Sequence, residues 1–305
     1  MNKQRPESRG DESSRDASMS GRLKRLKEPL AKAGFLTAAC VSILAVILIC
    51  VFLFANGLPA IGKIGPLDFL FGQTWRPSND IYGIFPMIMG SIYVTAGAIV
   101  IGVPIGIFTA IYLTKFCSSR TAKVLRPAVE LMAGIPSVVY GFFGMVVLVP
   151  FIRETFGGNG SSMLTASILL GIMILPTIIT VSAASIKAVP GSYYEGALAL
   201  GASHERSVFA VLVPAAKSGI TASVVLGVGR AIGETMAVIM VAGNQARMPA
   251  GILKGVRTMT ANIVIEMGYA ADLHREALIA TAVVLFVFIL IINLLFSLLK
   301  RRTRQ

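Results

Sequence analysis

The sequence predicts an all-α membrane protein that crosses the bilayer with six helices. Of its 305 residues, 55% are hydrophobic and only 14% are charged, whereas a soluble domain carries about 25% charged residues. So few charges cannot cover the surface of a water-soluble core. The apolar residues also gather into runs long enough to span a hydrocarbon layer of about 30 Å at about 1.5 Å per residue. We therefore expect one polytopic domain rather than a soluble globular protein.

The six predicted helices together define a transmembrane domain over residues 34–299. They cover residues 34–55, 86–113, 129–149, 163–184, 220–242 and 277–299. Pro104, Pro136 and Pro176 lie inside the second, third and fourth runs. Neighbouring helices in a bundle can cover the backbone hydrogen bonds that these prolines remove. We expect kinks at these positions.

The residues outside the six helices form an arm at the start and a short tail at the end. About the first twenty residues of the arm, 1–33, are polar and bury too little apolar surface to fold alone. We expect them to be disordered. Further along, Leu23, Leu26 and Leu30 share one helical face among basic residues, which is typical of a short helix on a membrane surface. The tail, 300–305, is basic.

Basic residues are distributed unequally between alternate segments of the chain. The arm, the second and fourth loops and the tail hold 20 Lys and Arg, whereas the first, third and fifth loops hold 7. Because basic residues stay on the cytoplasmic side of a membrane, both termini are predicted to be cytoplasmic. The net charge of +13 is then mainly a topological signal. It indicates contact of the arm with anionic membrane lipid, and no nucleic acid is expected as a partner.

Motifs for catalysis, metal binding and nucleotide binding are all incomplete. Residues 57–63 have the glycine and lysine spacing of a phosphate-binding loop, but Ile64 stands where a hydroxyl side chain must ligate magnesium. His204 and His274 fall on opposite sides of the membrane in the predicted topology, so they cannot share a metal ion. We predict no enzyme activity, and neither a cofactor nor a metal in this chain.

The cytoplasmic loop 187–217 is the first segment that predicts a function. It contains, in this order, Glu195, Gly196, Ala197, Gly201 and Pro214. Without a side chain, Gly201 allows a sharp turn between two short helices and the close approach of a partner surface. The loop therefore predicts a lever that enters a cleft in a partner protein, and an ordinary helical hairpin is the alternative.

A charged pair inside the fifth predicted helix is the second functional feature. An arginine near the membrane centre costs about 2.5 to 3.5 kcal/mol on translocon scales, so Arg230 needs a partner. Glu234, four residues later, is expected on the same helical face, while Gly229 and Gly233 leave room for a substrate. A planar guanidinium suits a tetrahedral oxyanion. A pair that only locks helix packing is the alternative.

The extracytoplasmic loop 244–276 is predicted to contain an amphipathic helix. One helical face carries Met259, Ile263 and Met267, with Asn262 and Glu266 among them. This pattern fits either a partly re-entrant helix over a channel mouth or a solvated cap. Both would serve as a docking surface for a partner.

The loop 187–217 resembles the coupling loop of ABC-transporter permeases. The pattern of that family is Glu-Ala-Ala, three residues, Gly, nine residues, then Ile-x-Leu-Pro. This chain keeps the spacing and departs from the pattern at Gly196, Val211 and Val213.

From about residue 84 to residue 299, the chain resembles the C-type permease subunit of bacterial phosphate-specific ABC transporters. The segments that carry this resemblance are residues 230–238, 243–244, 257–263 and 266–268. It implies a type I ABC-importer fold in the bacterial inner membrane and a channel shared with a sister A-type permease subunit. It also implies an ATPase dimer, which binds ATP and magnesium, and a periplasmic phosphate-binding protein.

Two groups of site residues follow from this resemblance together with the patterns above. The expected translocation residues are Arg230, Glu234, Thr235, Gly229 and Gly233. The expected extracytoplasmic docking or gate residues are Arg257, Thr258, Asn262 and Glu266. We expect Glu234 to neutralise Arg230 in the resting channel, and an arriving phosphate ion to compete for the guanidinium group.

Other functions remain open at this point. Sulfate, molybdate and phosphonate are oxyanions that charge alone does not distinguish from phosphate. An ion-coupled secondary transporter would use the pair Arg230 and Glu234 without ATP, but it would not need a coupling loop. An intramembrane enzyme would need a paired nucleophile and base within the helices, and the sequence has none.

Overall fold

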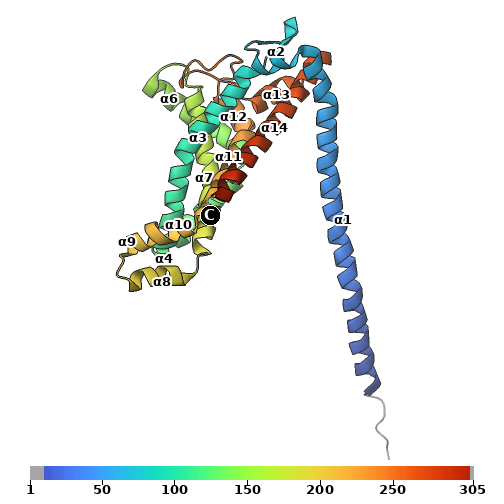
Figure 1. Cartoon of the computed structure of the whole chain (residues 1–305), viewed down its shortest axis with the longest axis vertical. Helices are drawn as coiled ribbons and strands as arrows, with labels where there is room; N and C mark the ends of the chain where they lie inside the picture. The colour runs from blue at the N-terminus through green and yellow to red at the C-terminus, as the bar shows by residue number, and fades with distance from the viewer. Residues whose placement is uncertain (1–9, 303–305) are drawn as a thin grey trace, which may run out of the picture. The chain divides into compact units, whose positions relative to one another are not determined.

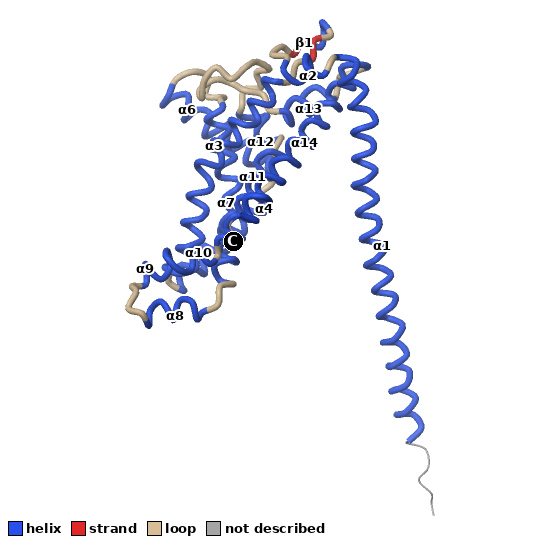
Figure 2. Tube along the Cα trace, in the orientation of Figure 1, coloured by secondary structure: helices blue, strands red, loops and turns tan. Residues whose placement is uncertain are grey.

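A computed structural model describes residues 10–302, and the side chains of residues 32–296 and 298. Within this part the chain consists of helices, one two-stranded hairpin and the loops that connect these elements (Figures 1 and 2). It divides into two compact units, the first ending at Ala55 and the second beginning at Asn56.

The described part of the first unit is one long helix. This helix, α1 (Gly10–Ile64), starts in the first unit, and its last residues belong to the second. Large apolar side chains such as Phe35, Leu44 and Ile47 are exposed along it, which suits a helix surrounded by lipid. The part from Lys32 to Ile64 is long and apolar enough to cross a membrane. The first predicted span is therefore confirmed, with a longer extent.

The arm differs from the disordered segment and separate surface helix that we expected. α1 begins at Gly10 and continues through the arm into the span without a break. Extending an existing helix avoids the cost of nucleating a new one, so the apolar span carries the helix into the polar arm. Residues 1–9 and 303–305 lie outside the described residues. At the other terminus, α14 (Asp272–Arg302) continues past residue 299.

Three helices form the core of the second unit. α7 (Met163–Lys187) packs against both α3 (Phe85–Ile111) and α11 (Lys217–Gly233). Ile178 of α7 is fully buried, and a Cβ at Gly106 of α3 would lie 2.7 Å from its Cγ2 atom. The glycine thus allows the two backbones to approach closely, as is common between membrane helices.

The shorter elements gather at two ends of this unit, which we name the α8 end and the α13 end (Figure 1). The α8 end contains η2 (Tyr112–Phe116), α8 (Gly191–Ala199), α9 (His204–Ser207), η4 (Val208–Leu212) and α10 (Val213–Ala215). The α13 end contains α2 (Pro66–Phe71), β1 (Trp75–Arg76), η1 (Pro77–Asn79), β2 (Ile81–Tyr82), α6 (Val149–Phe156) and α13 (Met259–Met267). The two strands pair antiparallel, with Trp75 opposite Tyr82.

Four of the six predicted spans are confirmed as single long helices. The first, second, fourth and sixth correspond to Lys32–Ile64, Phe85–Phe116, Met163–Lys187 and Asp272–Phe296. The chain continues in helical form through Pro104 and Pro176, so these prolines do not end their helices.

The third predicted span, 129–149, is wrong in its position. α4 (Ser119–Gly134) ends before Ile135, and a new span runs from Ser137 to Phe156 through α5 (Ser137–Phe143), η3 (Gly144–Leu148) and α6. Ile135 is extended, with ψ 126°, because a residue that precedes proline avoids the helical conformation. Pro136 therefore separates two helices instead of kinking one.

Candidate functional site

The fifth predicted span, 220–242, is interrupted where its two charged residues lie. α11 ends at Gly233, and α12 (Met236–Val241) begins after Thr235. Glu234 between them is extended, with φ −71° and ψ 130°. Before α11 there is a second discontinuity, a bend of 68° between the segment His204–Ala215 and α11. The expected uninterrupted helix through Arg230 and Glu234 is therefore wrong.

Arg230 is half-buried in the last turn of α11 and is held from α7. Its Nη1 atom donates a hydrogen bond to Thr177 Oγ1 at 3.3 Å. Among the residues whose side chains are described, the guanidinium group makes this one hydrogen bond. Arg230 also interacts electrostatically with Tyr140 of α5, whose hydroxyl group donates to the Met132 carbonyl oxygen at 2.9 Å. Most of the guanidinium N–H groups thus remain available to a ligand.

Glu234 does not form the expected ion pair with Arg230. The described residues form ion pairs only elsewhere in the chain. The Oε1 atom of Glu234 instead accepts the backbone N–H groups of Thr235 and Ala237, at 3.2 and 3.3 Å. These amides start α12 and have no partner inside that helix. The extended backbone at Glu234 removes the four-residue helical spacing on which the predicted pair depended.

The two glycines beside Arg230 face open space. A Cβ at Gly229 or Gly233 would meet no heavy atom within 4 Å, so neither glycine serves close packing within the described part of the chain. Thr235 is half-buried, and its hydroxyl group donates to the Gly233 carbonyl oxygen at 3.2 Å. The five predicted translocation residues therefore lie along one short segment, around a helix break and next to an unoccupied surface.

The loop 187–217 has the two short helices that we predicted from Gly201. α8 ends at Ala199, Gly201 takes the left-handed conformation with φ +83°, and α9 begins at His204. Glu195 and Gly196 are exposed, Ala197 is half-buried, and Leu200 is 90% exposed. Tyr193 and Leu198 of the same segment are also exposed, and such a group of apolar side chains suits contact with another protein. Pro214, in α10, is also exposed.

His204 attaches this loop to η2, the last part of the span that begins with α3. Its Nδ1 atom lies 2.7 Å from the Tyr194 hydroxyl oxygen and its Nε2 atom 3.1 Å from the Lys115 carbonyl oxygen. The ring of Phe116 contacts it edge-on, with centroids 4.8 Å apart. Because a carbonyl oxygen only accepts, Nε2 is the donor and Nδ1 accepts from Tyr194 when the ring is neutral. These contacts connect α8, through His204 of α9, to the span that ends at Phe116.

The predicted docking or gate residues of the loop 244–276 are largely buried. Thr258, Asn262 and Glu266 are at most 5% exposed, and the Arg257 side chain is 15% exposed. The Thr258 hydroxyl accepts the Ala261 amide at the start of α13. These four residues therefore do not form an open docking surface, and both the re-entrant helix and the cap stay predictions. The polar side of α13 turns inward because it meets polar partners there.

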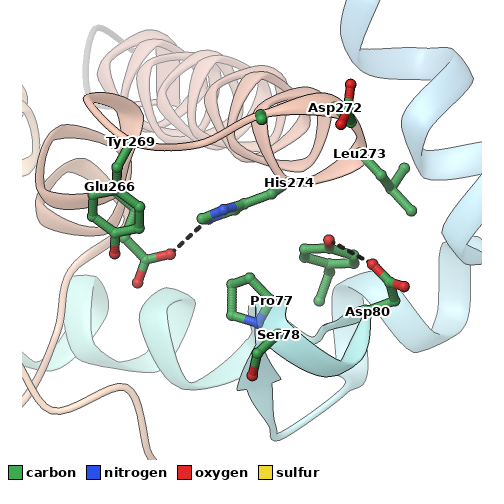
Figure 3. A pocket seen from close by; sticks show the side chains of 10 residues that line it. Pro77, Ser78, Asp80, Glu266, Tyr269, Asp272, Leu273 and His274 are labelled. Carbon is green, nitrogen blue, oxygen red and sulfur yellow. Dashed lines mark hydrogen bonds and ion pairs between the residues drawn. The ribbon is translucent and has the colours of Figure 1, made fainter.

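Glu266 is the centre of this buried polar cluster, and Figure 3 shows its contact with His274. Its Oε1 atom lies 2.6 Å from Arg257 Nη1, and its Oε2 atom accepts from Trp75 Nε1 at 2.8 Å and contacts His274 Nε2 at 2.9 Å. Arg257 also donates to Asn262 Oδ1 and to the Asn244 carbonyl oxygen, both at 3.0 Å. A buried carboxylate is stable only with such partners, so this cluster joins α13, α14 and the β1–β2 hairpin.

His274 lines an open pocket of about 560 Å³ (Figure 3), and aromatic rings lie against it. The ring of Tyr82 stacks on it with centroids 6.2 Å apart, and Trp75 lies edge-on at 6.1 Å. Burial, together with the hydrogen bond and charge of Asp80, raises the pKa of Tyr82 to about 12. The phenol therefore stays protonated and donates to Asp80 at neutral pH.

Several residues of these sites were not found from the sequence. Thr177 and Tyr140 lie in apolar runs, where no spacing connects them to Arg230. Trp75 and His274 lie almost 200 positions apart, so their common contact with Glu266 has no local signal. No group of three potential ligands that could hold a metal ion occurs among the described residues.

Comparison with known proteins places these features in a family context. Residues 102–305 match the family described as binding-protein-dependent transport system inner membrane component. The chain is 40% identical over 270 residues to the probable ABC transporter permease protein YqgH of Bacillus subtilis, which covers 85% of this chain and 87% of the relative. It is 34% identical over 280 residues to the phosphate transport system permease protein PstC of Mesorhizobium japonicum, with coverages of 84% and 85%.

A solved structure has the same fold. A chain of a bacterial alginate ABC transporter, determined in complex with an alginate-bound periplasmic protein, superposes with a TM-score of 0.64. The match covers 91% of this chain and 98% of that chain at 17% identity. At this identity, the likeness concerns the fold alone.

Proposed function

Because the chain belongs to the family of binding-protein-dependent transport system inner membrane components and has the type I fold of ABC-importer permeases, we propose that it translocates inorganic phosphate. It forms the channel together with a sister A-type permease subunit. Relatives named as phosphate permeases support this choice of substrate, with identities of 30 to 34% in four of them. As a permease of this family it is a transport channel component, and ATP hydrolysis belongs to a separate subunit.

The observation that carries the proposal is the setting of Arg230. Its guanidinium group has one recorded hydrogen bond, to Thr177, and the neighbouring Gly229 and Gly233 leave open space. A tetrahedral oxyanion needs several N–H donors from a planar group and room to approach them. A single, poorly neutralised arginine also binds weakly enough for the ion to leave again.

The energy for transport comes from a partner that the loop 187–217 reaches. We assign this loop to an ATPase dimer, which binds the ATP and magnesium, so that no cofactor is needed in this chain. The exposed Glu195 and Leu200 and the sharp turn at Gly201 present α8 to a cleft. The contacts of His204 with Tyr194 and Lys115 then connect that movement to the bundle.

The orientation that we propose places the α8 end and both termini in the cytoplasm, and the α13 end in the periplasm, of a bacterial inner membrane. The distribution of basic residues supports this orientation. A periplasmic phosphate-binding protein then delivers substrate at the α13 end. Anionic lipid surrounds the basic arm.

Other oxyanions are the nearest alternative, because sulfate, molybdate and phosphonate are also held by arginine. An ion-coupled transporter is less well supported, since the expected ion pair of Arg230 with Glu234 is absent from the described structure and the coupling loop would have no use.

The test is phosphate-dependent ATP hydrolysis by the reconstituted complex, with sulfate as the competing anion. We expect Arg230→Gln to abolish the phosphate-dependent part, because it removes the cation and keeps similar size and polarity. Arg153→Gln removes an exposed arginine at the α13 end and serves as the matched control. Wild-type phosphate flux in correctly assembled Arg230→Gln complexes would show that the proposed site is wrong.

The coupling loop allows a second test. Gly201→Leu places a side chain in the left-handed conformation, at a cost of about 1 to 2 kcal/mol. Because Gly201 is exposed, we expect the loop to relieve this strain by opening its turn locally, so the unfolding midpoint of the bundle is unchanged. Less ATPase should co-purify, and hydrolysis should lose its dependence on phosphate. Glu195→Lys should act in the same direction.

Gly196→Ala is the control for this test, because Gly196 is exposed, helical and unhindered. Normal ATPase recovery and normal transport with Gly201→Leu would return the loop to an ordinary hairpin.

A further inference from the structure

A second pocket with basic side chains lies between α4, η2 and α7. It measures about 230 Å³ and is lined by Arg126 and Glu130 of α4, by Thr114 of η2, and by Thr180 and Lys187 of α7. This volume corresponds to several waters at roughly 30 Å³ each, which is room for one phosphate group with part of its hydration. We call it the Arg126–Lys187 pocket.

We propose that the Arg126–Lys187 pocket binds a phosphate group at the cytoplasmic end of the bundle. The group belongs either to inorganic phosphate leaving the channel or to the head of an anionic phospholipid. The first source rests on the proposed function, whereas the second requires only a membrane protein with this fold.

Neither cation of the pocket forms an ion pair with another residue whose side chain is described. The ion pairs of the described residues are Lys63 with Glu276 and Glu266 with Arg257 and His274, so neither Arg126 nor Lys187 belongs to one. Glu130 lines the same pocket and also lies in no ion pair among the described residues. Together, Arg126, Lys187 and Glu130 carry a net charge of one positive unit. That excess attracts an anion, and the carboxylate keeps its binding weak.

One hydrogen bond fixes the Arg126 guanidinium group at the pocket. Arg126 Nη2 donates to the Leu113 carbonyl oxygen at 3.3 Å, which holds the guanidinium group at the end of η2 and leaves its other N–H groups available. Thr114 donates to backbone carbonyls of α3, so it cannot donate to a ligand. Lys187 and Thr180 are exposed at the pocket and supply the remaining donors.

The surroundings of the pocket admit both sources. Apolar side chains, among them Leu113, Val129 and Ile179, form part of its wall, and Lys187 is the last residue of a membrane span. Basic pockets between helices on the cytoplasmic side are typical sites for anionic headgroups. Phosphate released from Arg230 leaves the membrane at this same end in the proposed orientation.

The experiment measures binding to the purified complex in two arms. In the first, radiolabelled inorganic phosphate is titrated by equilibrium dialysis into complexes in phosphatidylcholine nanodiscs. All of them carry Arg230→Gln, which removes the proposed intramembrane site. In the second, native mass spectrometry counts the phosphatidylglycerol molecules that stay bound to complexes from anionic membranes. The proposed function is tested separately, by the effect of Arg230→Gln on transport. If that test fails, both binding measurements still give an interpretable result.

The deciding variant is Arg126→Gln with Lys187→Gln. We expect it to weaken phosphate binding by about tenfold or to lose one retained lipid. The matched control is Arg120→Gln with Lys123→Gln, which removes the same charge from exposed positions of the same helix outside the pocket. It should stay within about twofold of the starting protein. If the double variant fails to assemble, the exposed Lys187→Gln alone decides.

Each outcome has one meaning. Loss of phosphate binding places the pocket on the substrate route, and loss of a retained lipid makes it a lipid site. Either result supports a phosphate-group site. Absence of binding in both arms, or equal losses in the variant and the control, overturns the inference.

Discussion

Two arginines of this chain have opposite surroundings. Arg257 at the α13 end forms an ion pair with Glu266 and also donates to Asn262 and to a backbone carbonyl. Arg230 has one recorded hydrogen bond, at 3.3 Å, beside two unhindered glycines. The protein accepts three hydrogen bonds from the five N–H groups of Arg257 and one from those of Arg230.

Under the proposed function, this difference separates a structural charge from one that binds substrate. A buried charge whose partners are all present is costly to disturb, because removal of one partner leaves the others unpaired. A half-buried charge with few partners has already lost part of its hydration. A ligand that supplies hydrogen-bond acceptors therefore binds it more favourably than it binds a charge whose partners are all present. We therefore expect substitutions near Arg257 to affect stability, and substitutions near Arg230 to affect transport.

Glu266→Gln should have the largest effect on stability. It removes the charge that neutralises Arg257 and turns an amide N–H group toward donors from Trp75 and His274. Breaking a buried pair costs about 3 to 5 kcal/mol, so the thermal unfolding midpoint of the purified permease should fall clearly. Glu276→Gln breaks the exposed pair with Lys63 and should cost only about 0 to 1 kcal/mol. Equal shifts in the two variants would remove the contrast on which the comparison rests.

Gly90→Ala and Gly229→Ala compare the same substitution in the two settings. A Cβ at Gly90 would overlap the carbonyl oxygen of Arg257, so we expect a loss of about 1 to 3 kcal/mol from overpacking. Gly229 is helical and unhindered, so alanine there should stabilise the helix by up to about 1 kcal/mol. If substrate passes Gly229, transport by that variant should nevertheless fall. Unfolding midpoints and phosphate uptake, measured on both proteins, test whether Gly229→Ala loses transport without losing stability.

Thr177→Val should have the smallest effect and tests how Arg230 is oriented. It removes the acceptor of the single recorded hydrogen bond, worth about 1 kcal/mol, while it keeps the shape of the side chain. We expect the phosphate concentration for half-maximal ATP hydrolysis to rise roughly fivefold, with little change in the maximal rate. Thr177→Ser keeps the hydroxyl group and should resemble the wild type. An unchanged half-maximal concentration with valine would mean that Thr177 has no part in positioning Arg230.

The sequence identified Arg230 correctly as a residue that needs explanation, but it predicted the wrong partner. Four-residue spacing favours Glu234 only if the helix is continuous, and no proline announces the break at Glu234. The partner in the structure, Thr177, is 53 positions away. Such a contact depends on how α7 packs against α11, which no local pattern records.

The two long loops differ in how well the sequence predicted them. In the loop 187–217, Gly201 alone decides where the helices separate, because its left-handed conformation is a property of one residue. The loop 244–276 was predicted to contain an amphipathic helix, and α13 exists. Its polar residues were expected at a surface, yet Glu266 is buried because Trp75, Arg257 and His274 surround it.

The sequence by itself determined that this is a helical membrane protein, where most of its spans lie and which loop turns sharply at a glycine. These features follow from apolar length, the distribution of charge and the conformational freedom of single residues, all of which act locally. Only the tertiary structure decided which polar groups meet. A hydrogen bond requires atoms about 3 Å apart, and the helices that bring Arg230 to Thr177 and Glu266 to Trp75 are distant in the chain.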